Sequence, residues 1–251
     1  MAAKLAPTRH SRPTTRHSAV SRYHWFWGRV SAEFGVRSQG EQVTSYFEQL
    51  KNDLETYRKL SSRGGHLGFF GQEVLRFYSI AGTFVEGCDF RLDESASNDE
   101  RYFTHILVRS LLENYFWITY LFDDPSKSSA RYDELQNSFK RDYAKLLNEN
   151  QLPHKDKLEP ADSSWSSLPR ALDVKSMLAQ STNDYGDRLD YLYFVYRITS
   201  FDTHGKSLGA IFHDAFGKTC NFPVLKIGYA IELMANQYLV DLQELRGRNE
   251  I

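Results

Sequence analysis

The segment from residue 100 to residue 122, ERYFTHILVRSLLENYFWITYLF, restricts the fold more than any other part of the sequence. At 100° per residue its apolar side chains cover nearly the whole circumference of a helix, and a helix that is apolar on all sides is buried. Ser97, Asn98 and Asp99 stand directly before it, and each is a residue type that caps helix N-termini. The sequence therefore predicts a central buried helix that other helices surround.

The rest of the chain has the periodicity of surface helices. Apolar residues at three- and four-residue steps predict helices at residues 41–60, 69–86, 129–149, 184–204 and 224–246, with a short helix near 170–180. Residues 150–169 contain three prolines and predict a long surface loop, and the stretch around His213 predicts an irregular segment. We expect an all-α protein, an elaborated helical bundle of about five or six main helices that forms a single domain over residues 23–251.

The first 22 residues have a different composition. They contain five Lys or Arg residues, and no acidic residue occurs before Glu33. This composition predicts a disordered basic arm over residues 1–22, although an organelle transit peptide has a similar composition. The aromatic stretch YHWFWGRV at residues 23–30 is too apolar to stay in solvent, so we expect it to pack on the folded domain.

Composition excludes several functional classes. The formal net charge is -1, which argues against a nucleic-acid binder that depends on a general positive field. Cys88 and Cys220 are far apart and lack the spacing of zinc ligands or of a disulfide scaffold. No apolar run reaches the roughly 18 residues that span a membrane. We therefore expect a cytoplasmic protein that spans no membrane and needs neither a metal ion nor a cofactor.

Two helices carry polar residues at positions where an apolar core is expected. In the central helix, His105, Arg109 and Glu113 are four residues apart and so lie along one stripe. Buried charges are costly unless they are paired, so two interpretations remain open. Arg109 and Glu113 either form an ion pair that anchors a neighbouring helix or line a polar pocket in the bundle.

The second polar set lies near the end of the helix predicted at 184–204. Arg197 and His204 are seven residues apart and face the same way, with Ser200 between them and Tyr193 one turn earlier. Arginine binds phosphate through a planar fork, and histidine transfers protons near neutral pH. The two side chains could converge on one phosphodiester. Alternatively, His204 caps the helix C-terminus and Arg197 pairs with Glu113.

The stretch RITSFDTH, from Arg197 to His204, resembles the arginine–histidine signature of the HEPN superfamily. These are all-helical proteins, and many are metal-independent ribonucleases of toxin–antitoxin, abortive-infection and CRISPR systems. The two-part pattern RSLLENYFWITYLF and YRITSFDTHG is also similar to a group of bacterial helical proteins known only as a domain of unknown function. The resemblance covers roughly residues 103–213.

This resemblance implies an endoribonuclease that leaves a 2′,3′-cyclic phosphate. His204 would act as general base or acid, and Arg197 would stabilise the charge on the phosphorane oxygens. The supporting residues implied are Arg109, Glu113, Ser200 and Tyr193. The implied partners are RNA, a second copy of the chain in a homodimer, and an antitoxin or another protein, in a setting of phage defence or stress.

One position departs from the superfamily pattern. Active members often have a polar residue directly after the arginine, whereas this chain has Ile198. An apolar residue there is compatible with an inactive or sensing member. The alternative expectation is a non-catalytic helical binding module, in which Arg109, Glu113, Arg197 and His204 form a structural network.

Overall fold

The computed structural model describes residues 45–92, 95–204, 208–218 and 225–251. Every regular element within these ranges is a helix, which confirms the predicted all-α class. In chain order the elements are α2 (Tyr46–Leu50), η1 (Lys51–Asp53), α3 (Leu54–Ser61), α4 (Gly65–Val85), α5 (Asn98–Asp123), η2 (Pro125–Lys127), α6 (Ser128–Asn148), η3 (Lys155–Lys157), η4 (Ser163–Ser167), α7 (Val174–Gln180), α8 (Asp187–Thr203), α9 (Leu208–Phe216) and α10 (Ile227–Gly247). The basic arm predicted at residues 1–22 and the aromatic stretch at 23–30 lie outside the described ranges.

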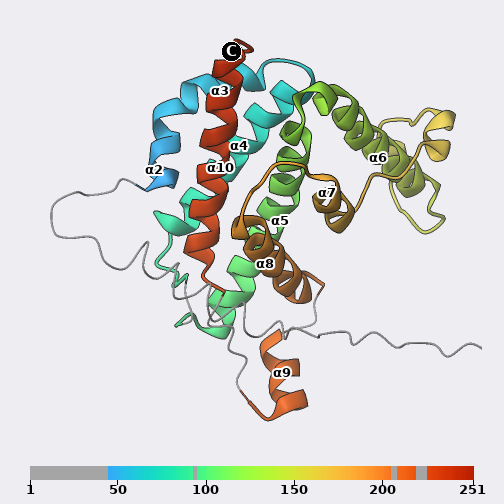
Figure 1. Ribbon diagram of the computed structural model, residues 1–251. Coiled ribbons are helices and arrows are strands. Elements are labelled where there is room, and N and C mark those ends of the chain that lie inside the picture. The colour runs from blue at the N-terminus through green and yellow to red at the C-terminus, as the bar shows by residue number, and fades with distance from the viewer. Residues whose placement is uncertain (1–44, 93–94, 205–207, 219–224) are drawn as a thin grey trace, which may run out of the picture. The chain divides into compact units, whose positions relative to one another are not determined.

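Helix α5 is the central buried helix that the sequence predicts (Figure 1). Of the three candidate N-caps, Ser97 is the one used. Its hydroxyl accepts a hydrogen bond from the Glu100 N–H (3.3 Å), and the Glu100 carboxylate accepts one from the Ser97 N–H (2.7 Å). Every residue from Tyr115 to Asp123 is buried. Five described helices, α4, α5, α6, α8 and α10, have 17 residues or more, which fits the five or six main helices expected.

Aromatic rings fill the space between α4, α5 and α10. The Tyr238 ring of α10 lies edge-on to Phe77 of α4 (centroids 5.1 Å apart) and to Tyr115 of α5 (5.9 Å). The rings of Phe70 and Phe122 lie 5.0 Å apart. Each of these five side chains is at most 4% exposed, so a large share of the apolar area removed from water comes from rings.

The prediction of one continuous helix over residues 41–60 is wrong for the part that the structure describes, because that part is divided into α2, η1 and α3. Ser45 caps α2, because its hydroxyl accepts from the Glu48 N–H (3.0 Å). At the interruption, the Asp53 carboxylate accepts from Arg246 of α10 (2.6 Å). That contact is tertiary, so the local apolar period does not reveal it.

Helix α4 begins at Gly65, four residues before the predicted start, and crosses α3 at close range. A Cβ atom at Gly71 would lie 2.5 Å from the Ser61 nitrogen and 2.7 Å from the Tyr57 oxygen. The close approach of α3 and α4 therefore requires glycine at this position. Only residues 62–64 separate α3 from α4.

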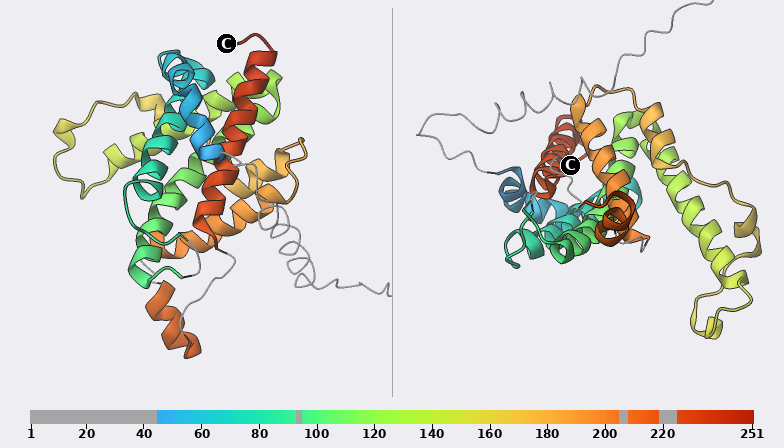
Figure 2. Two further views of the ribbon diagram at one scale, coloured as in Figure 1. Left: turned by 90° about the vertical axis from the view of Figure 1, so that its left-hand side faces the viewer. Right: turned by 90° about the horizontal axis from the view of Figure 1, so that it is seen from below.

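The segment after α6 folds back along that helix (Figure 2). As expected, residues 150–169 contain no α-helix, but they do contain the short turns η3 and η4. The Tyr143 hydroxyl of α6 donates to the Glu159 carbonyl (2.8 Å), and the Tyr143 and Trp165 rings lie 6.3 Å apart. These contacts fix the loop on the surface of α6.

Helix α8 runs antiparallel to α5 and is attached to it near both ends. At one end the buried Asp123 of α5 accepts from the backbone N–H groups of Thr182 (3.0 Å) and Asn183 (2.9 Å), just before α8 begins. At the other end His105 of α5 contacts Asp202 of α8, with 2.7 Å between Nδ1 and Oδ2. We call this arrangement the α5–α8 pair.

Helix α9 corrects the prediction of an irregular segment around His213. Its residues are apolar at the spacing of an amphipathic helix, and Gly217, at a φ of 61°, follows its last residue. Ile211 is 54% exposed and Phe216 is 64% exposed. A Cβ at Gly209 would lie 3.2 Å from the Asn98 side chain, so the start of α9 lies close to the start of α5.

None of the helices in the described ranges combines the length and apolar composition needed to cross a lipid bilayer.

Candidate functional site

The two predicted catalytic residues lie on the solvent-facing side of α8. Arg197 and His204 are both exposed, whereas Val195, Thr199 and Asp202 between or beside them are buried. Within the described residues Arg197 forms no ion pair, so the expected alternative pairing with Glu113 does not occur there. His204 is the C-cap of α8, and its backbone N–H donates to the Ser200 carbonyl (3.2 Å). The cap is thus made by the backbone of His204, and its imidazole is exposed.

Arg109 and Glu113 form a connected polar network at the border between α5 and α8. The Arg109 guanidinium pairs with Glu113, donates through Nε to the Ser200 hydroxyl (3.0 Å), and lies 3.5 Å from the centre of the Tyr196 ring. The Tyr196 hydroxyl donates to Glu113 (3.2 Å). Burial, with Glu113 adding to it, raises the pKa of Tyr196 to about 12, so the phenol stays neutral and can donate.

Of the four predicted supporting residues, three belong to this network: Arg109, Glu113 and Ser200. The fourth, Tyr193, stacks on the Tyr196 ring (centroids 6.0 Å apart). The structure therefore joins the supporting residues into one network around Tyr196. Arg197 and His204 stand beside that network on α8, without a hydrogen bond or ion pair to any of its side chains in the described residues.

Sequence reasoning missed the most deeply buried polar contact of the α5–α8 pair. The side chains of His105 and Asp202 are 2% and 4% exposed. Asp202 stands within the motif Arg197–His204, and it lies three and seven residues after Thr199 and Val195, both buried. That spacing places Asp202 on the same inner face of α8 as these two residues, so it is the sequence signal from which burial of Asp202 can be predicted.

Replacing Asp202 with alanine is expected to lower the free energy of unfolding by about 2 kcal/mol, because it leaves the buried His105 nitrogen without its acceptor. Urea unfolding followed by circular dichroism measures the loss. Asp190, exposed on the same helix, provides the control, and Asp190→Ala should change stability by less than about 0.5 kcal/mol. Equal losses in the two variants would contradict a structural role for Asp202.

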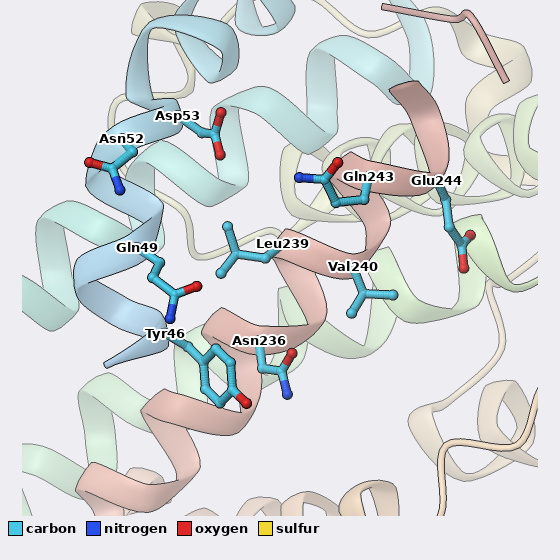
Figure 3. A pocket seen from close by; sticks show the side chains of 9 residues that line it. All are labelled: Tyr46, Gln49, Asn52, Asp53, Asn236, Leu239, Val240, Gln243 and Glu244. Carbon is cyan, nitrogen blue, oxygen red and sulfur yellow. The ribbon is translucent and has the colours of Figure 1, made fainter. Parts of the chain in front are cut away.

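A groove elsewhere in the bundle contains no predicted site residue. It has a volume of about 600 Å³, and residues of α2 and η1 face residues of α10 across it (Figure 3). Side-chain amides and aliphatic groups line most of it. Its two carboxylates are already paired, Asp53 with Arg246 (2.6 Å) and Glu244 with Arg248 (3.4 Å). The groove therefore offers no free acid–base pair for catalysis.

The described residues contain no cluster of three His, Cys, Asp or Glu side chains that could hold a metal ion.

Comparison of the sequence with protein-family models, with curated proteins and with solved structures gives no match in any of the three. The chemistry of the side chains on α8 therefore provides the main basis for inferring a function.

Proposed function

We propose that the exposed face of α8 cleaves RNA by metal-independent phosphoryl transfer, as the HEPN-like signature implies. One observation supports this most. Arg197 and His204 are exposed on one face of a helix, whereas the charged residues of α5 beside them are engaged in the network around Tyr196. A permanent cation and an imidazole are thus available to a phosphodiester.

In the proposed reaction, His204 takes the proton of a ribose 2′-hydroxyl. The 2′-oxygen attacks the adjacent phosphorus, the bond to the 5′-oxygen breaks, and a 2′,3′-cyclic phosphate and a 5′-hydroxyl are formed. Arg197 stabilises the charge on the non-bridging oxygens. Because one histidine cannot accept the 2′ proton and at the same time protonate the leaving 5′-oxygen, the proposal includes a homodimer, in which the second His204 donates the proton to the 5′-oxygen. The setting is cytoplasmic, in phage defence or a toxin–antitoxin or stress response.

The test is cleavage of single-stranded RNA by the purified protein in the presence of EDTA. His204→Ala and Arg197→Ala are each expected to lower the cleavage rate about a hundredfold without loss of folding. The exposed residues His213 and Arg170 provide matched controls, and His213→Ala and Arg170→Ala should cleave as the wild type does. Absence of cleavage by the wild type, or equal loss in the control variants, would overturn the proposal.

A second candidate is a non-catalytic helical module that binds a protein partner. The observation that favours it is the apolar surface of α9, where Ile211 and Phe216 are more than half exposed. This module would leave RNA intact, and His204→Ala would not change its binding of a partner. The EDTA cleavage assay therefore separates the two functions.

A further inference from the structure

A phenylalanine interrupts the polar residues on the exposed face of α8. Phe201 is 46% exposed, and its ring makes no ring–ring contact within the described residues. It lies four residues after Arg197 and three before His204, so the three side chains fall within an arc of about 60° on one side of the helix. The two neighbours stand about 6 Å and 4.5 Å along the axis from it.

We propose that Phe201 is a stacking platform for an unpaired base of the RNA, next to the phosphate held by Arg197 and His204. The inference rests on the proposed function and adds a substrate class to it. A phenyl ring offers any base a flat apolar surface, and stacking on an aromatic side chain strengthens the binding of single strands about tenfold for each base. The flanking arginine and histidine lie where the neighbouring backbone would pass.

The surroundings of Phe201 favour RNA over a protein partner. A protein-binding surface has a contiguous apolar centre. On α8, however, the exposed residues on either side of Phe201 along its face are Arg197 and His204, whereas the apolar Phe194 and Ile198 nearby are only partly exposed. An exposed ring between an arginine and a histidine matches the alternation of base and phosphate along a single strand.

Two properties of the substrate follow from this platform. Stacking does not read the hydrogen-bonding edges of a base, so binding should depend little on sequence. A base within a duplex is already stacked and paired, so the platform should favour unpaired RNA.

The experiment measures binding separately from cleavage. The probe is a fluorescein-labelled single-stranded RNA of about 12 nucleotides in which every ribose carries a 2′-O-methyl group, so that no 2′-hydroxyl can attack. Fluorescence anisotropy of the full-length protein gives the dissociation constant. Phe201→Ala should weaken binding about tenfold, and Phe201→Trp should retain it. Phe139, which is 66% exposed on α6, is the matched control, and Phe139→Ala should bind as the wild type does.

A second probe carries 2-aminopurine, whose fluorescence is quenched on stacking. Wild type should quench it and Phe201→Ala should not. If both proteins bind and quench equally, Phe201 is not the platform, even if native RNA is cleaved. If only the wild type quenches the probe but native RNA is not cleaved, stacking on Phe201 is supported and the proposed cleavage reaction is refuted. If the wild type does not bind the probe, the platform is refuted and Phe201 is better explained as a protein contact.

Discussion

Replacing Asp123 with alanine is expected to lower the free energy of unfolding by about 3–5 kcal/mol, because it removes one partner from a buried charged cluster. The Asp123 carboxylate lies 3.8 Å from Arg131, and the side chains are 0% and 4% exposed. It also accepts from the Thr182 and Asn183 backbone (3.0 and 2.9 Å) and from the Tyr185 hydroxyl (3.2 Å). Without it, the Arg131 charge remains buried and several donors lose their acceptor.

Urea unfolding at constant pH, followed by circular dichroism, measures this effect. Asp156 is exposed in η3 and forms no hydrogen bond in the described residues, so Asp156→Ala is the matched control and should stay within about 0.5 kcal/mol of wild type. A loss below about 1 kcal/mol in Asp123→Ala would show that solvent replaces these contacts without difficulty.

Stability is expected to fall between pH 5.5 and 7.5 through a second buried carboxyl group, Asp241. One of its oxygens accepts from Gln237 (2.8 Å), and Gln237 in turn accepts from Arg188 (2.8 Å). The other oxygen is buried and has no hydrogen-bond partner among the described residues. Burial is the main cause that raises the pKa of Asp241 to about 7.

The direction of the pH effect follows from the two protonation states. Below about pH 4 the carboxyl group is neutral in both the folded and the unfolded chain, so folding is not penalised. As the pH rises from about 4 to about 7, the unfolded chain ionises first and the folded state loses stability relative to it. The total loss approaches about 4 kcal/mol, of which about 2 kcal/mol falls between pH 5.5 and 7.5.

The Asp241→Asn variant isolates this contribution, because an amide keeps the acceptor for Gln237 but does not ionise. The difference in unfolding free energy between this variant and the wild type should shift by about 2 kcal/mol over that pH range. Asp156→Asn, an exposed control, should show no such shift. A difference that stays constant with pH would mean that Asp241 ionises normally in the folded protein.

The sequence predicts the helices well where local spacing determines them. The capping box at Ser97 and the continuous apolar run that follows are local features, so the existence and burial of α5 could be read directly. The division of the helix predicted at 41–60 accompanies a contact with α10, and the close crossing at Gly71 depends on a contact with α3. Neither contact is encoded in the local spacing of apolar residues. Helix α9 is not predicted, because its nine residues are too few to show a clear helical period.

For the candidate site, spacing correctly places Arg197 and His204 on one face but does not tell which face is buried. It predicts the ion pair of Arg109 with Glu113, one of the two interpretations left open, and the structure shows this pair. It does not predict that Ser200 accepts from Arg109 or that His105 meets Asp202, because both contacts depend on the register between two helices. Whether Arg197 and His204 act on RNA stays a prediction.

The attachment of α8 to α5 near both ends has a consequence for binding. Because contacts at Asp123 of α5 and at Asp202 of α8 hold α8 in place, α8 is ordered before a ligand binds. Binding therefore costs little backbone conformational entropy along this helix. Only the exposed side chains still have to be ordered, and fixing the rotamer of each one costs about 0.5–1.5 kcal/mol of binding free energy. The face that carries Arg197, Phe201 and His204 is in this sense preorganised.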